Sequence, residues 1–174
     1  NVTPGYFDQP DLTKAMFDEE GFYRIGDAAT FVDDADPVQG LIFAGRVVED
    51  FKLMTGTFVQ VGPLRTDAIA AATPVVHDAL VAGQDRPFVG LLAWPNLHAC
   101  RQLMNAPEAS FDEAVKHPAV LAGLRKGLEA HNAACNGASS TRIARAMLMA
   151  EPPSIDGNEL TDKGYINQRA GLDR

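Results

Sequence analysis

The chain has 174 residues, of which 46% are hydrophobic and 22% charged, a composition typical of a folded globular protein with one good core. Its formal net charge of −8 argues against nucleic acid or an anionic membrane as the main partner, because both bind clustered Lys and Arg. No apolar run approaches the roughly 20 residues of a membrane span, and no signal-like segment opens the chain, so we expect a cytoplasmic protein.

The first part of the chain predicts a short helix and a small sheet. A helical turn is expected over residues 12–17, with Asp11 as its cap. Three short runs rich in aromatic and β-branched residues follow, at residues 22–25, 28–32 and 41–44, with Gly, Asp and Pro between them. We expect these runs to pair as an antiparallel sheet.

A hairpin and a helix are expected next. Residues 51–54 and 57–61 flank Thr55-Gly56, a pattern typical of a β-hairpin. Pro63 is expected to open a helix, because proline is favoured in the first helical turn, and Pro74 to end it.

Three more strands are expected in the second half of the chain. Residues 75–82 and 88–93 form two of them, and the second is so apolar that it must be covered on at least one face. Residues 142–149 form the last strand. Two or three helices are expected between the second and the last of these strands.

The helices carry clear start signals. Ser110 and Glu113 fit a capping box, and Pro118 begins a longer helix that runs to about residue 134. Its apolar residues recur at helical spacing and are expected to face a core: Val120, Leu121, Leu124 and Leu128. The whole pattern predicts an α+β fold, in which a compact lobe with a small mixed sheet flanked by helices follows a β-hairpin and a short β-rich piece.

Cysteine and histidine are scattered. Cys100 and Cys135 form no C-x-x-C pair, so we expect two reduced and largely buried thiols. The four histidines lack the spacing of metal ligands, and no metal site is expected: His77, His98, His117 and His131.

Four charged side chains are candidates for chemistry, each with an ordinary alternative. Asp27, in a Gly-Asp turn, suits two vicinal hydroxyls such as those of a ribose, or merely closes a hairpin. Arg46 suits a phosphate or carboxylate, or pairs at the surface with Glu49 or Asp50. Lys52 sits on a strand and is otherwise an exposed strand lysine.

Lys163 lies between Asp162 and Gly164 in a polar loop near the end of the chain. Such a lysine is easily left in water and is able to stabilise charge on a phosphoryl group once it is brought to one. The ordinary alternative is a solvated lysine. The chain contains no Gly-x-x-x-x-Gly-Lys or Gly-x-Gly-x-x-Gly motif.

Three segments stand out together: residues 4–27 (PGYFDQPDLTKAMFDEEGFYRIGD), residues 45–52 (GRVVEDFK) and residues 161–169 (TDKGYINQR). The first resembles the G-Y-x-x-x-P-x-x-T-x-x-x-F-x-x-x-G-W-x-x-T-G-D segment of the adenylate-forming acyl-CoA synthetase superfamily. The second is similar to its G-R-x-x-D-x-I-K hinge motif, and the third to its terminal T-x-x-G-K-x-x-x-R motif. The three occur in the superfamily's order over nearly the whole chain.

Finer details resemble feruloyl-CoA synthases within that superfamily. They are residues 49–57 (EDFKLMTGT), residues 61–65 (VGPLR) and the Asp-Lys-Gly order at the end. Other details depart from the common pattern. Val48 stands where many relatives carry Asp or Lys, residues 63–66 replace Pro-x-Glu-Ile-Glu, and the glycine follows Lys163 instead of preceding it.

The resemblance implies a role for each candidate. Enzymes of this superfamily join a carboxylate to ATP with Mg²⁺, release pyrophosphate, and pass the acyl group to coenzyme A. Asp27 and Arg46 would bind the nucleotide, and Lys163 would act in the first step. After rotation about a hinge at Val48, Glu49 or Asp50, Lys52 would act in the second step.

The resemblance also implies the domain organisation. Residues 1–47 would end a large adenylation lobe, and residues 48–174 would form the mobile C-terminal lobe, whose partner is that N-terminal lobe. No Ser/Thr/Gly-rich segment ending in Pro-Lys is present, so the chain alone is expected to be inactive. The alternatives are a fatty-acyl or other aryl-CoA ligase, or a non-catalytic α+β interaction domain.

Overall fold

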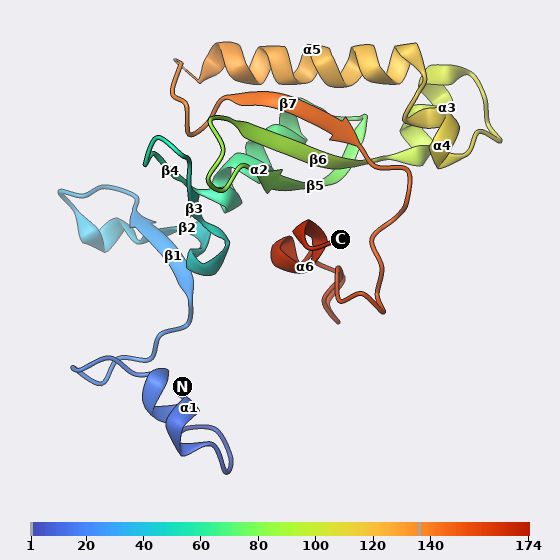
Figure 1. The fold of residues 1–174 in the computed structure, drawn as a ribbon. Helices are drawn as coiled ribbons and strands as arrows, with labels where there is room; N and C mark the ends of the chain where they lie inside the picture. Colours follow the sequence, from blue (N-terminus) through green and yellow to red (C-terminus); the bar gives the residue numbers. More distant parts are fainter. Residues whose placement is uncertain (1, 136) are drawn as a thin grey trace. The chain divides into compact units, whose positions relative to one another are not determined.

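The computed structural model describes residues 2–135 and 137–174 (Figure 1). It divides into two compact units, Asn1–Val48 and Glu49–Arg174. The division falls one residue after the boundary expected from the sequence. That the first unit completes a larger lobe stays a prediction.

In the first unit, residues 2–48 contain one short α-helix, a 3-10 helix and a two-stranded antiparallel sheet. Its helices and strands are α1 (Pro10–Ala15), β1 (Asp27–Phe31), the 3-10 helix η1 (Pro37–Gln39) and β2 (Leu41–Arg46), and the 3-10 helix η2 (Val47–Glu49) leads out of it. Strand β1 pairs with β2, as expected from the sequence.

Two expectations for the first unit are wrong. Residues 22–25 form no strand, because the carboxylate of Asp18 accepts hydrogen bonds from the N–H groups of Glu20 (3.0 Å) and Phe22 (2.8 Å) and closes a turn. Only an isolated bridge joins Tyr23 to Phe17. Asp11 does not cap α1 either, because it lies in the first turn of a helix whose N-terminal cap is Gln9.

The second unit is an α+β lobe, which confirms the fold class. Its strands are β3 (Phe51–Lys52), β4 (Phe58–Val59), β5 (Val76–Ala82), β6 (Val89–Pro95) and β7 (Ile143–Leu148). Its helices are α2 (Val61–Ala71), α3 (Leu97–Met104), α4 (Phe111–Ala114), α5 (Pro118–Ala134) and α6 (Gln168–Leu172). Strands β3 and β4 form the hairpin, and β5, β6 and β7 form a separate sheet.

The three-stranded sheet is mixed. Strand β5 is antiparallel to β6, and β7 is parallel to β6. Parallel neighbours require a long crossover, and helices α3, α4 and α5 provide it. Figure 1 shows α5 running along one side of the sheet and α6 on the other.

Both faces of the sheet are covered along the middle of β5, whereas most residues of β7 are exposed. On β5, Ala79 and Val81 belong to the main core, whereas Leu80, between them, belongs to a second cluster with Trp94 and Ile166. The alternation follows from the pleat of a strand, which sends successive side chains to opposite faces. The C-terminal segment, which contains Ile166, therefore covers the face that α2 and α5 leave open.

Helix α2 begins two residues earlier than expected, at Val61 instead of Pro63. The N–H of Val61 donates to Oδ1 of Asp50 (2.9 Å), so a carboxylate outside the helix satisfies one of its free N–H groups. Pro63 lies within the first turn, where it costs no hydrogen bond.

Helix α5 has the bounds expected from the sequence. Val120, Leu124 and Leu128 are buried in the main core, but Leu121 is 43% exposed, so one of the four residues expected to face the core does not. Among the residues that the structure describes, no helix is both long and apolar enough to cross a membrane.

The capping box at α4 is confirmed. The Glu113 N–H donates to Oγ of Ser110 (3.3 Å), and the Glu113 carboxylate accepts from the N–H (2.8 Å) and the hydroxyl (2.8 Å) of Ser110. These hydrogen bonds hold the pKa of the Glu113 carboxyl below its usual value. Because folding lowers this pKa, the ionised Glu113 carboxylate stabilises the folded state. The stabilisation is fully present at a pH above the pKa of Glu113 in the unfolded chain, and it is lost as the pH falls through the lower pKa of the folded state.

We therefore expect Ser110→Ala to raise the pKa of Glu113 towards that of a free glutamate, since the variant removes the hydroxyl donor. Carbon-detected NMR titration of the Glu113 carboxyl in wild type and variant measures this directly. An unchanged pKa in the variant would show that the side-chain part of the box is not formed in solution.

Candidate functional site

The first unit brings two candidate residues together. Asp27 begins β1 and Arg46 ends β2, and the two are partners across the strand pair. The Val47 N–H also donates to the carbonyl of Gly26 (3.0 Å), which extends the pairing one step further. A carboxylate and a guanidinium from separate motifs thus lie on adjacent strand ends, both exposed.

A β-bulge produces this arrangement. Between the pairs Asp27–Arg46 and Ala29–Phe43, strand β2 has one residue more than β1. Gly45 lies in this bulge with φ +94°, a conformation that favours glycine. Because the side-chain direction alternates along a strand, the extra residue changes the face on which Arg46 lies.

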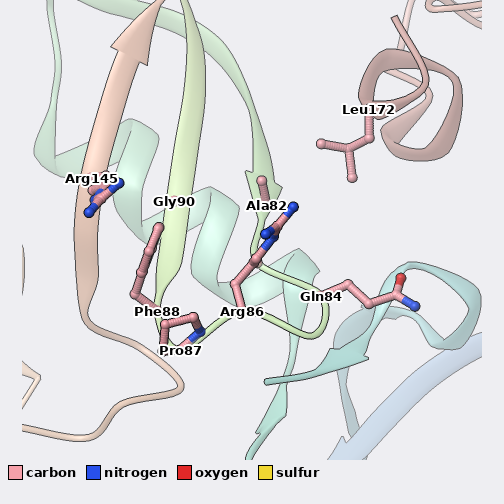
Figure 2. A pocket seen from close by; sticks show the side chains of 9 residues that line it. Ala82, Gln84, Arg86, Pro87, Phe88, Gly90, Arg145 and Leu172 are labelled. Atoms are coloured by element: carbon pink, nitrogen blue, oxygen red, sulfur yellow. The ribbon is translucent and has the colours of Figure 1, made fainter. Parts of the chain in front are cut away.

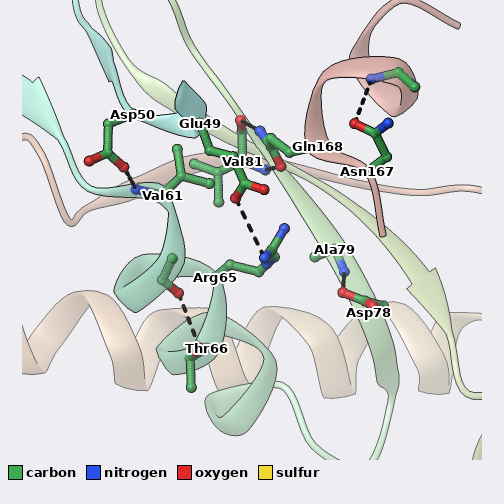
Figure 3. Close-up of polar contacts among 12 residues, drawn as sticks. Glu49, Asp50, Val61, Arg65, Thr66, Asp78, Ala79, Val81, Asn167 and Gln168 are labelled. Atoms are coloured by element: carbon green, nitrogen blue, oxygen red, sulfur yellow. Dashed lines mark hydrogen bonds and ion pairs between the residues drawn. The ribbon is translucent and has the colours of Figure 1, made fainter. Parts of the chain in front are cut away.

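The segment proposed as a hinge crosses the boundary between the two units. Val48 ends the first unit and is 82% exposed, whereas the side chains of Glu49 and Asp50 are held within the second unit. Oε2 of Glu49 lies 3.6 Å from Nη2 of Arg65 in α2, and Asp50 accepts from Val61 (Figure 3). The start of the second unit is therefore tied to α2 by two carboxylates.

Arg65, the partner of Glu49, is a residue that the sequence did not single out. Its side chain is mostly buried, and its Nη1 has no hydrogen-bond partner within the described part of the chain. The sequence offered one signal, since Arg65 stands where the superfamily pattern Pro-x-Glu-Ile-Glu has its first Glu.

Lys52 lies on the exposed side of β3. Its neighbours Phe51 and Leu53 are buried, so the strand turns only the lysine outwards. The carbonyl of Lys52 accepts from the N–H of Asp85 (3.1 Å), which ties the strand to the loop between β5 and β6. The hairpin turn closes with two bonds, from Gly56 N–H to the carbonyl of Leu53 (2.8 Å) and from Leu53 N–H to that of Thr57 (2.9 Å).

Lys163 lies in a turn of the same kind. The Gly164 N–H donates to the carbonyl of Thr161 (2.8 Å), and the Thr161 N–H donates to that of Tyr165 (2.8 Å). Gly164 has φ +78°, a left-handed conformation that favours glycine at the end of such a loop. Lys163 thus projects from the tip of a closed hairpin and is exposed.

The departure from the common Gly-Lys order is explained by this turn. A glycine is required after the two central turn residues, and Lys163 is the second of them. With its glycine at position 164, the chain keeps the lysine at the tip and the left-handed conformation at a residue without Cβ.

Buried polar residues flank this hairpin on both sides, and the sequence did not reveal them. Glu159 is 5% exposed, and its carboxylate accepts from the Ser154 N–H (2.6 Å). Oε2 of Glu159 also lies 3.5 Å from Nη1 of Arg174. Gln168 is 3% exposed and contacts β5. Nothing in their local sequence distinguishes these residues from exposed polar ones.

A pocket of about 640 Å³ lies beside the loop that joins β5 and β6 (Figure 2). Arg86, Phe88 and Arg145 line it together with Leu172 of α6. The guanidinium of Arg145 lies over the ring of Phe88, 4.4 Å from its centroid, in a cation–π contact. The pocket is mainly apolar, with its two arginines exposed at the surface.

Within residues 2–135 and 137–174, no group of three or more His, Cys, Asp or Glu side chains is placed to hold a metal ion. Both cysteines are free. Cys100 is fully buried, and burial raises the pKa of its thiol. Cys135 is half-buried, with its Sγ 3.4 Å from Nε2 of His131.

Comparison with known proteins gives a family. Residues 52–174 match the model of the AMP-binding enzyme C-terminal domain. The chain is 26% identical, over 92% of its length, to a chloroplastic long-chain-fatty-acid–[acyl-carrier-protein] ligase of Arabidopsis thaliana. It is 32% identical, over 51% of its length, to a 4-coumarate–CoA ligase of Pinus taeda.

Among solved structures, the A domain of a carboxylic acid reductase from Segniliparus rugosus, in complex with AMP and a co-purified carboxylic acid, has the same fold. Its TM-score is 0.75 at 23% identity over 98% of this chain. The chain spans 21% and 15% of the two curated relatives and 24% of the structure.

Proposed function

Because the chain belongs to the family of AMP-binding enzyme C-terminal domains, in the adenylate-forming superfamily, we propose that it is the C-terminal part of an ATP-dependent, AMP-forming acyl-CoA ligase. The observation that carries the proposal is the exposed lysine at the tip of a closed hairpin, within the segment that matches the family. The protein that contains it would have a larger N-terminal lobe, which supplies the acyl pocket and most contacts to ATP.

The first reaction would form an acyl-adenylate. A carboxylate oxygen attacks the α-phosphorus of ATP, an O–P bond forms, the bond to the bridging oxygen breaks, and pyrophosphate leaves. Lys163 would donate hydrogen bonds to the α-phosphate and the attacking carboxylate, which holds the two anions together and offsets charge as it develops. No other described residue has been assigned to this step.

The nucleotide would be held by the first unit. Asp27 offers two carboxylate oxygens to the ribose hydroxyls, and Arg46 offers fixed donors to ribose or phosphate oxygens. Their pairing across β1 and β2 supports a common ligand, since the two groups are presented on adjacent strand ends. Mg²⁺ would neutralise the phosphates of ATP, and the residues described here provide no cluster to hold it.

The second reaction would transfer the acyl group. The thiol sulfur of CoA attacks the acyl carbon and loses its proton, and AMP leaves with the electron pair of the broken C–O bond. Lys52, on the β3–β4 hairpin, is the candidate for this step, after the second unit has rotated about Val48, Glu49 or Asp50. The boundary of the compact units between Val48 and Glu49 supports a pivot there.

An aromatic acid is the proposed carboxylate. The feruloyl-type segment at residues 49–57 supports it, and a 4-coumarate–CoA ligase is among the relatives. A fatty acid is the second candidate, because another relative is a fatty-acid ligase that uses acyl-carrier protein. We place the enzyme in the cytoplasm, with no nucleic acid or membrane partner.

The test uses the full-length protein. We expect it to release pyrophosphate with ATP, Mg²⁺ and ferulate or 4-coumarate, and to form the thioester when CoA is added. Palmitate, with CoA or with acyl-carrier protein, tests the second candidate. The 174-residue chain alone is the control, and it should release none.

Two outcomes would change the proposal. Turnover of palmitate but not of ferulate moves the specificity to fatty acids and leaves the ligase assignment intact. A full-length protein that is folded but inert with every carboxylate supports the non-catalytic interaction domain.

A further inference from the structure

Gln168 makes an unusual pair of hydrogen bonds. Its side-chain Nε2 donates to the carbonyl of Val81 (2.5 Å), and the Val81 N–H donates to its Oε1 (3.2 Å), as Figure 3 shows. Val81 lies on β5, which is at the edge of the sheet. The amide of Gln168 thus occupies the place that the backbone of a further strand would take, and it satisfies both polar groups of Val81.

The same segment is fixed by close packing. Ile166 is buried with Leu80 and Trp94 in the second cluster. A Cβ added at Gly171 would lie 2.8 Å from Cδ1 of Leu80, so α6 packs closely against this buried side chain of β5. A helix of five residues is not stable alone, so these contacts are what hold α6 in place.

These contacts continue directly into the hairpin that carries Lys163. An isolated bridge joins Leu160 to Ile166, and the N–H of Asn167 donates to the carbonyl of Glu159 (2.8 Å). We name residues 159–174 the C-terminal clasp. The lysine tip lies between two buried anchors of the clasp, Glu159 before it and Gln168 after it.

We propose that Gln168 is a positioning residue for Lys163: by bonding both backbone groups of Val81, it fixes the clasp to β5 and so fixes the direction of the lysine. This inference rests on the proposed role of Lys163 in adenylation. Gln168 touches no substrate, and its effect passes only through the lysine. Because the clasp is packed on the sheet within one compact unit, Lys163 would enter and leave the site with the whole second unit.

The first test measures catalysis in the full-length protein. Gln168→Met keeps much of the volume and removes both hydrogen bonds. It is expected to slow pyrophosphate release by about 10-fold, since a displacement of 1 Å near a reacting centre costs up to roughly 100-fold. Thioester formation from added acyl-adenylate should change less than about 2-fold, because that step does not use Lys163.

A double-mutant cycle separates positioning from a general structural effect. In a Lys163→Ala background, Gln168→Met should slow pyrophosphate release by less than about 2-fold, because no lysine remains to be placed. A further loss of about 10-fold in that background would overturn the proposal, as would an unchanged rate in the Gln168→Met single variant. Gln84→Met, which changes an exposed glutamine of the same unit, is the matched control.

A second test needs no activity. Trypsin cleavage after Lys163 requires local opening of the clasp, and its rate follows the population of the opened form. We expect Gln168→Met to raise cleavage there about 10-fold, with cleavage after the α5 residue Lys126 unchanged. Equal cleavage after Lys163 in wild type and variant would contradict the inference.

The two tests also distinguish this inference from the function on which it rests. If the wild type activates no carboxylate, the proposed function fails, and the protease result still shows whether Gln168 fixes the clasp. Where Gln168→Met does not fold, Gly171→Ala replaces it, since its added Cβ pushes α6 from Leu80 without changing a polar group.

Discussion

Replacing Lys163 with alanine in the full-length protein is expected to slow pyrophosphate release by on the order of 100-fold to 1,000-fold, the usual cost of one preorganised donor to a developing charge. The lysine projects from the tip of a hairpin whose turn is closed by two hydrogen bonds. Its substitution therefore removes a charge without changing the fold. A quench assay with ATP, Mg²⁺ and an accepted carboxylate measures the rate.

The two half-reactions should respond differently. Thioester formation from added acyl-adenylate and CoA should remain within about 2-fold of wild type, because Lys163 is proposed to act only before the rotation. Lys126→Ala, which removes an exposed lysine from α5, is the matched control. A Lys163→Ala enzyme with normal pyrophosphate release would show that the terminal motif has another role.

Gly127→Val is expected to destabilise the second unit by more than about 3 kcal/mol, a large share of the stability of a typical domain. Gly127 lies where α5 meets α2. A Cβ there would lie 2.9 Å from Cα of Ala72 and closer still to the carbonyl oxygen of Ala71. Those atoms are backbone, so they cannot rotate aside, and the two helices must separate.

Urea unfolding followed by circular dichroism measures this effect on the 174-residue chain. Ala122→Val is the matched control, because it adds a similar volume to an exposed position of the same helix and costs less than about 1 kcal/mol through helix propensity. If Gly127→Val unfolds at the same urea concentration as this control, the helices are not packed as closely as the structure has them.

The four candidate site residues could be found from the sequence alone. Asp27, Arg46, Lys52 and Lys163 are singled out by short motifs, because each motif keeps its chemistry and its turn residues within a few positions. Their local settings follow from the same residues: the two lysine hairpins close on Gly56 and Gly164, both with positive φ. Their proposed roles rest on the resemblance to the family, and the experiments above would test them.

The buried polar residues around the site could not be recognised from the sequence. Nothing near Gln168 indicates that it is buried, and its partner Val81 lies 87 positions earlier in the chain. Arg65 and Glu159 are likewise charged residues whose burial depends on distant neighbours. The pairing of Asp27 with Arg46 depends on the bulge at Gly45, which shifts the register of β2 by one residue relative to β1.

By itself, the sequence determined the features that depend on contiguous residues. These are the α+β class, the capping box at Ser110, the bounds of α5 and the turns that present the lysines, because propensity, capping and turn geometry act over a few positions. Only the tertiary structure decided which residues are covered. Leu121 shares the apolar pattern of α5 and is exposed, whereas the polar Gln168 is buried, because burial depends on what the rest of the chain places opposite each side chain.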